Sequence, residues 1–252
     1  AYDAEGVDKP NMNLPFGQDQ LIEAVLKANP KTIIVLMGGG PVDMSAWADD
    51  AQGIIEGWYP GMEGGNALAK VIFGEVNPSG KLPMTFPAKL EDSPAHQLGD
   101  FPGKNGVANY NEDIYVGYRY FDTYKVTPRF AFGHGLSYTS FSYRDLKVNA
   151  SGKQVEVSLS IKNTGGLDGS EIIQLYVHDE QSEVKRPEKE LKGFVKVFLK
   201  AGEEQVVKMV LPPSAFKYFD EQTAQWKLEK GKFMIMAGAS SRDIRLQENV
   251  DL

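Results

Sequence analysis

The residue types that most often perform chemistry in proteins are sparse and scattered in this sequence. Its three histidines, His96, His134 and His178, lie far apart and do not have the spacing of metal ligands. There is no cysteine, which excludes thiolate chemistry and cysteine-ligated metals. Three glycines at 38–40 could cradle a phosphate, but they fit neither the dinucleotide-binding pattern nor the P-loop pattern. We interpret them as a tight strand-to-helix connection, and we expect neither a metal nor a cofactor.

Carboxylates are plentiful, and the composition limits what they could act on. The 252 residues carry a formal net charge of −7, with acidic and basic residues interspersed. This balance argues against nucleic acid or an anionic membrane as the main partner, and a neutral substrate such as a sugar fits better. Hydrophobic residues make up 42% of the chain and charged residues 24%, as in folded globular proteins. The apolar runs are far too short to span a bilayer.

The first part of the chain alternates helix and strand signals that could position such groups. Apolar residues at helical spacing predict a helix over 18–29, and a second helix is predicted over 63–73, ended by Gly74. A continuous apolar run over 32–37 predicts a strand buried on both faces, and 54–58 predicts another short buried strand. This order indicates an open α/β sheet. Two or three strands are few, so we expect the sheet to need strands from elsewhere.

Residues 75–140 are rich in proline, glycine and aromatic residues and show little periodicity, which indicates a long wrapping segment. From Phe141 the pattern becomes purely β. Apolar residues from Val155 to Ile161 alternate with polar ones, as in a half-buried strand. Further strands are expected over 172–177, 191–199, 206–211 and 233–237. Several short strands at this spacing predict a β-sandwich of immunoglobulin or fibronectin type III shape.

Four longer motifs carry a resemblance to a known family. The first runs through WYPGMEGG (58–65), Ala69 and FG (73–74) into NPSGKLP (77–83) and TFP (85–87). The others are YNEDIYVGYRYFD (110–122), FGHGLSYT (132–139) and GASSRD (238–243). Together and in this order they resemble family 3 glycoside hydrolases, the β-glucosidase family, over essentially the whole chain.

The resemblance implies an α/β region followed by an all-β region. Family members have a (β/α)8-like barrel, then an α/β sandwich, then a fibronectin type III-like domain. This sequence resembles only the last two parts, so we expect a partial α/β sandwich domain over 1–127 and a fibronectin type III-like (immunoglobulin-like) β-sandwich over 128–252. The barrel, which carries the aspartate nucleophile and most sugar-binding side chains in the family, is absent. No residue here is assigned those roles, and the substrate-binding residues stay unknown.

The resemblance also implies one catalytic residue. Many members place the acid/base glutamate on a loop with the pattern EGxDRxxLxLP, and residues 5–15 read EGVDKPNMNLP. Glu5 is therefore the acid/base candidate, and Gly6 beside it would let the loop approach a substrate closely. Lys9 replaces the arginine of the pattern, which puts a bidentate contact there in doubt. Asp8 is expected to brace the loop, and a solvated surface carboxylate remains the alternative for Glu5.

Other motif residues are given structural roles. Glu63 is expected to brace the start of its helix, and Glu112 is expected to brace the segment between the domains. His134 is expected to be a structural turn residue.

The function implied by the resemblance is part of a retaining, exo-acting β-glucosidase that lacks its barrel and is inactive alone. A β-xylosidase of the same family is one alternative. A non-catalytic carbohydrate-binding or scaffold module is another, although Trp226, the only tryptophan after residue 140, makes a thin aromatic platform. The expected partners are the barrel domain, on the same or a separate chain, and a β-glucoside or oligosaccharide substrate. A homodimer is left open, and a periplasmic or secreted location is slightly favoured.

Overall fold

The computed structural model describes residue 6, residues 9–152 and residues 154–252. The chain divides into two compact units whose segments alternate along the sequence. Unit 1 comprises residues 1–76, 86–112 and 127–130, and unit 2 comprises residues 77–85, 113–126 and 131–252. The sequence predicted a single domain boundary, between residues 127 and 128, and this boundary stays a prediction.

Two helices of unit 1 form where the spacing of apolar residues predicts them. α1 (Gln18–Ala28) begins after Gly17, which adopts the left-handed conformation with φ of 73°, and ends at Asn29. α2 (Gly64–Ile72) ends two residues before Gly74, whose φ is 77°. Glycine tolerates this conformation because it has no Cβ. No helix in the described residues is both long enough and apolar enough to cross a membrane.

The sheet of unit 1 consists of two parallel strands, β1 (Ile33–Leu36) and β2 (Gly53–Glu56), with Ile34 opposite Ile54. The predicted burial on both faces is wrong, because Ile33 is 47% exposed and every residue of β2 is only half-buried. Both strands are edges of a two-stranded sheet in the described part of unit 1. Burial of both faces requires elements packed on each face, and the residues of the strands do not encode those elements.

The glycine run does not lead into a helix, so that interpretation is wrong as well. Residues 45–50 form turns, in which the Met44 carbonyl accepts a hydrogen bond from the Ala48 N–H at 2.9 Å. Trp47 is 1% exposed, and its indole N–H donates to Asp19 at 2.8 Å. The turns therefore carry a core residue of unit 1, a role that a short polar-looking segment does not reveal.

Short helical elements interrupt the segment that the sequence showed as irregular. They are a 3₁₀ turn at Leu90–Asp92, α3 (Pro94–Gln97) and α4 (Tyr118–Thr123). None is long enough to display a 3.6-residue period, which explains why the pattern did not predict them.

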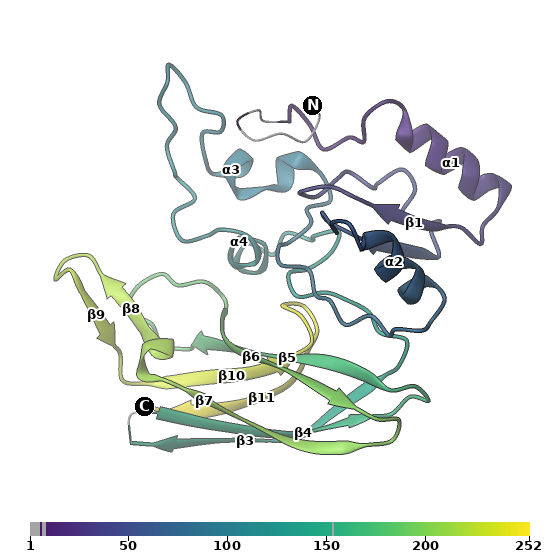
Figure 1. Cartoon of the computed structure of the whole chain (residues 1–252). Coiled ribbons are helices and arrows are strands. Elements are labelled where there is room, and N and C mark those ends of the chain that lie inside the picture. Colours follow the sequence, from purple (N-terminus) through teal and green to yellow (C-terminus); the bar gives the residue numbers. More distant parts are fainter. Residues whose placement is uncertain (1–5, 7–8, 153) are drawn as a thin grey trace. The chain divides into compact units, whose positions relative to one another are not determined.

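Unit 2 contains the β-sandwich (Figure 1). One sheet has the order β11-β10-β5-β6 and the other β3-β4-β7, while β8 and β9 form a separate hairpin. The strands are β3 (Phe141–Ser151), β4 (Gln154–Asn163), β5 (Gly169–Asp179), β6 (Glu190–Leu199), β7 (Glu204–Leu211), β8 (Lys217–Asp220), β9 (Gln225–Leu228), β10 (Lys232–Gly238) and β11 (Ile244–Asp251). A 3₁₀ turn at Pro213–Phe216 joins β7 to β8.

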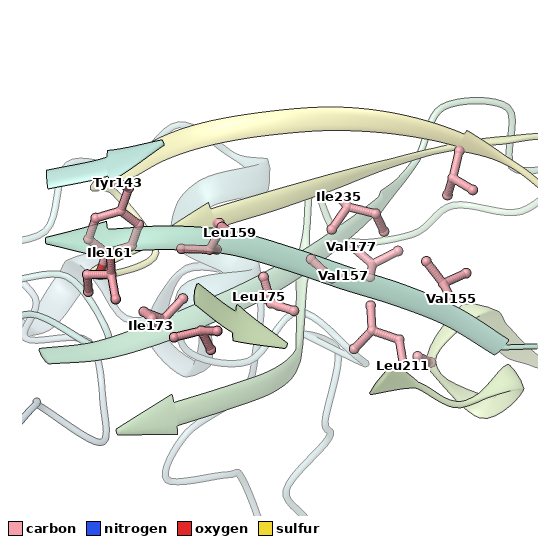
Figure 2. Close-up of a cluster of buried hydrophobic side chains, with 14 of the residues drawn as sticks. Tyr143, Val155, Val157, Leu159, Ile161, Ile173, Leu175, Val177, Leu211 and Ile235 are labelled. Atoms are coloured by element: carbon pink, nitrogen blue, oxygen red, sulfur yellow. The ribbon is translucent and has the colours of Figure 1, made fainter. Parts of the chain in front are cut away.

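The core of the sandwich comes from the alternation in its central strands. The apolar residues of β4 from Val155 to Ile161 are at most 1% exposed, as the alternation predicts. They meet Ile173, Leu175 and Val177 of β5 from the other sheet (Figure 2). Full burial of one aliphatic side chain is worth about 1.5–3 kcal/mol, so this layer dominates the stability of unit 2.

Four strands were not predicted as separate elements. β3 has a register shift between Arg144 and Lys147, and Asp145 there has a φ of 56°, so its alternation breaks in the middle. β11 lies at a sheet edge and is largely exposed and polar. β8 and β9 have four residues each, too few to show a period.

Candidate functional site

The acid/base candidate, Glu5, lies outside the described residues, as does Asp8. The residue next to Glu5 is described. Gly6 has a φ of 78°, and a Cβ built on it would meet no atom within 4 Å. Glycine is thus favoured here by the backbone conformation and not by lack of space.

The end of the same loop is anchored in unit 1. Met12 is 8% exposed, and its carbonyl accepts a hydrogen bond from the Asp43 N–H at 2.8 Å. The Asn11 side chain accepts from the Asn13 N–H at 3.0 Å and closes a tight turn around Met12. Met12 is therefore buried, and its backbone is hydrogen-bonded to the segment after β1.

The carboxyl ends of β1 and β2 lie side by side, because the Gly57 N–H donates to the Leu36 carbonyl at 2.8 Å. Ligands of open parallel sheets bind at this edge. Glu56 ends β2, is half-buried and accepts a hydrogen bond from the Trp58 N–H at 3.1 Å. Burial raises its pKa. Glu56 was not singled out from the sequence, although a carboxylate that ends an apolar strand is the signal that could have found it.

The first motif builds a tight turn before α2. A Cβ on Gly64 would lie 2.6 Å from the Pro60 ring, and one on Gly39 would lie 2.7 Å from the Tyr59 hydroxyl. Both glycines permit close packing, which accounts for Gly39 without a phosphate. Glu63 stands at the N-cap of α2 and accepts from the Asn66 side chain at 2.7 Å, with no side-chain bond to the helix backbone.

The second and fourth motifs meet in unit 2 through a buried carboxylate. Asp122 is 3% exposed and pairs with Arg242, whose guanidinium also donates to the carbonyls of Phe121 and Val126 at 2.8 and 2.9 Å. Lys189 reaches the other oxygen of Asp122 at 2.8 Å. The Arg242 fork thus fastens α4 to the turn after β10.

The third motif joins the fourth through Gln174 of β5. The Gln174 amide donates to the Gly133 carbonyl at 3.2 Å and to the Ala239 carbonyl at 2.7 Å, and its oxygen accepts from the Tyr176 hydroxyl at 2.6 Å. Gly133 has a φ of 78°, and a Cβ there would lie 2.2 Å from the Gln174 side-chain oxygen. Only glycine fits this position without displacing Gln174.

The last stretch of the first motif meets the third. The Asn77 oxygen accepts from the Ser137 hydroxyl at 2.9 Å and from the Tyr138 N–H at 2.8 Å. The His134 carbonyl accepts from the Leu82 N–H at 2.8 Å, as expected of a structural turn residue. Burial, followed by the nearby Lys81 charge, lowers the pKa of His134.

The remaining candidates do not come together as a site. His96 is hydrogen-bonded to Ser93 at 2.7 Å and His178 to the Glu188 carbonyl at 2.6 Å. Among the residues the structure describes, no group of three or more His, Cys, Asp and Glu could hold a metal ion. One carboxylate oxygen of Glu112 is buried without a hydrogen-bond partner in the described part of the chain.

Comparison with known proteins shows the family of this chain. Residues 1–138 match the description "Glycosyl hydrolase family 3 C-terminal domain", which covers more than half of the sequence. The chain belongs to glycoside hydrolase family 3. Residues 171–241 match "Fibronectin type III-like domain", which confirms the predicted fold class of the sandwich. The motif contacts described above therefore belong to a family 3 C-terminal region.

The similar proteins are much longer than this chain. "Thermostable beta-glucosidase B" of Acetivibrio thermocellus is 47% identical over 253 residues, which cover 99% of this chain and 33% of that protein. "Beta-glucosidase BoGH3A" of Bacteroides ovatus is also 47% identical, over 96% of this chain and 33% of its own length. The crystal structure of the Bifidobacterium adolescentis GH3 β-glucosidase matches with a TM-score of 0.95 and 41% identity, over 99% of this chain and 37% of that one. The chain thus spans about a third of the length of the curated relatives it matches.

Proposed function

We propose that this chain is the C-terminal portion of a retaining, exo-acting β-glucosidase that releases terminal β-linked glucose. The observation that carries the proposal is the match of almost the whole chain to proteins named β-glucosidases at 47% identity. Because the chain covers about a third of those proteins, its activity depends on the part that it does not contain.

The chemistry of this proposal needs two carboxyl groups about 5–5.5 Å apart. One attacks the anomeric carbon and forms a glycosyl-enzyme intermediate. The other protonates the leaving oxygen and then takes a proton from the incoming water. In the proposal Glu5 is this acid/base, and the nucleophile is an aspartate of a barrel domain on the same or a separate chain. No step requires a metal or a cofactor.

Two described features support the acid/base loop. The left-handed conformation of Gly6 turns the backbone directly after Glu5 without steric cost. The buried Met12 side chain and its carbonyl hold the other end of the loop. The anchor at Met12 limits the range of positions open to the loop, and proton transfer to a leaving group requires a positioned carboxyl group.

The alternatives are less well supported. The named relatives are β-glucosidases, which favours glucosides over xylosides. For a carbohydrate-binding module, Trp226 and Phe219 form a cross-strand pair on the β8–β9 hairpin, 64% and 49% exposed. Their rings stand edge to face at 70°, so they offer no flat platform of two rings.

The experiment that tests the proposal measures hydrolysis of an aryl β-glucoside. The 252-residue chain is assayed alone, then with the barrel-containing remainder of the protein added as a separate polypeptide. We expect no turnover by the chain alone and restored turnover by the mixture. Substantial turnover by the chain alone would contradict the proposal, because the nucleophile would then lie in this chain. An aryl β-xyloside, assayed in parallel, tests the alternative specificity.

A further inference from the structure

Unit 2 contains a polar pocket of about 310 Å³ that the proposed function does not use. It lies at the end of the sandwich where β3, β5 and β11 begin. Two ion pairs and a set of hydroxyl groups line it. The charged residues are Lys81, Glu171, Asp243 and Arg245, and the serines are Ser79, Ser137, Ser140, Ser170 and Ser240.

The charges of the polar pocket balance one another. Lys81 pairs with Glu171 at 2.9 Å, and the two side chains are 12% and 7% exposed. Arg245 pairs with Asp243 at 2.8 Å. With two cations against two carboxylates, the pocket has no net charge that would select an anion or a cation. His134 also lines the pocket, and burial, followed by the nearby Lys81 charge, lowers its pKa and so disfavours its charged form.

Among the described residues, part of the hydrogen-bonding capacity of the polar pocket is unused, although Ser137 and Ser240 have partners within the protein. A serine hydroxyl both donates and accepts, and a lysine ammonium has three donors. Lys81 uses two of them, on Glu171 and on the Gly135 carbonyl at 3.0 Å. The guanidinium of Arg245, a lining residue, lies 4.7 Å from the centre of the Tyr143 ring, and the buried Tyr143 hydroxyl has no hydrogen-bond partner among the described residues.

We propose that the polar pocket binds a neutral, polyhydroxylated molecule of the size of one sugar ring, that is, a monosaccharide. Its volume of about 310 Å³ lies at the lower end of the range for small-molecule sites, about 300–1,000 Å³, and fits one sugar ring. A sugar hydroxyl can donate to a carboxylate and accept from an ammonium or guanidinium, so it matches a charge-balanced lining. Leu136 and the half-buried Phe141 supply apolar surface for the C–H face of the ring.

The test is a titration of the isotope-labelled 252-residue chain with D-glucose, followed by amide NMR shifts. We expect saturable shifts centred on Ser170, Glu171 and Arg245. Ser170→Tyr places a ring in the pocket and should weaken binding by about tenfold or more. The matched control is Ser158→Tyr, a half-buried serine of β4 outside the pocket, which should leave binding unchanged. Thermal unfolding shows that each variant is folded. If Ser170→Tyr does not fold, Ser140→Tyr on the exposed pocket rim takes its place.

Three results would overturn the proposal. One is the absence of saturable shifts with glucose. Another is saturation with inorganic phosphate but not with glucose, which would mark an anion site. The third is glucose binding that the folded pocket variant, Ser170→Tyr or Ser140→Tyr in its place, leaves unchanged, which would place the ligand elsewhere. The outcome is independent of the proposed function, because Glu5→Ala should cripple hydrolysis of substrates with poor leaving groups by the reconstituted enzyme and leave glucose binding at this pocket intact.

Discussion

Replacing Asp122 by alanine should destabilise unit 2 more than any single change of a surface charge. The Asp122 side chain is 2% exposed, and its oxygens pair with Lys189 and Arg242. The Lys189 side chain is 10% exposed, and its only recorded ion pair among the described residues is with Asp122. Removal of the carboxylate would leave the Lys189 ammonium buried without a counter-charge.

The expected loss follows from this geometry. Breaking a buried ion pair from one side costs about 3–5 kcal/mol, because the remaining charge is uncompensated. The Arg242 side chain is 37% exposed, so water solvates it after the change and it adds little to the loss. We therefore attribute most of the effect to Lys189. In the double variant Asp122→Leu with Lys189→Met, both charges are gone and most of the stability should return.

The assay is urea unfolding of the 252-residue chain, followed by far-ultraviolet circular dichroism. The matched control is Glu204→Ala, which breaks the solvent-exposed pair of Glu204 with Arg144 and should hardly change the unfolding midpoint. If Asp122→Ala shifts the midpoint no more than Glu204→Ala does, the Asp122 pair does not fasten α4 to the sandwich. If the double variant is as unstable as the single one, the uncompensated lysine is not the cause.

Three further predictions concern other parts of the chain. Glu5→Ala in the complete enzyme should cripple hydrolysis of substrates with poor leaving groups, and added azide should partly rescue hydrolysis of substrates with good ones. The control Glu23→Ala, on the exposed face of α1, should behave as wild type. Wild-type activity of Glu5→Ala would refute the acid/base assignment. Burial raises the pKa of Glu56, so the folded chain binds this proton more tightly than the unfolded chain, and stability should fall as pH rises from the unfolded pKa through the raised folded one. Glu56→Gln should therefore be more stable than wild type above that window and lose the advantage below it in urea midpoints measured against pH, whereas an advantage independent of pH would contradict the reasoning. Gly133→Ala should destabilise unit 2, because the alanine Cβ would displace the Gln174 side chain. An unchanged thermal unfolding midpoint would show that the Gln174 side chain moves aside without loss of stability.

Local patterns in the sequence predicted those elements whose signal is contained in their own residues. The alternation over 155–161 predicted the central strand β4 and the face it buries, because side chains of a strand point to opposite faces with a period of two. α1 and α2 were predicted from helical spacing and from the residues that end them. The same reasoning failed for Ile33, since burial of a strand depends on neighbours that its own sequence does not contain.

The motifs show the same division. Their residue types and order were enough to indicate the family, which the comparisons confirm. Their contacts were not predictable, because the partners lie far apart in the chain. Asp122 and Arg242 are 120 residues apart, and Gln174 lies 41 residues from Gly133 and 65 from Ala239.

The sequence by itself indicated the family and the α/β-then-β order, because these follow from residue types in a fixed order. The family resemblance also implied the acid/base candidate Glu5, which stays a prediction. Only the tertiary structure decided that Glu56 ends a half-buried strand with a raised pKa, and that the polar pocket assembles around Lys81 and Glu171. The physical reason is that burial and charge pairing depend on groups that the fold brings together in space. A local sequence pattern does not identify which distant residue will be the contact partner.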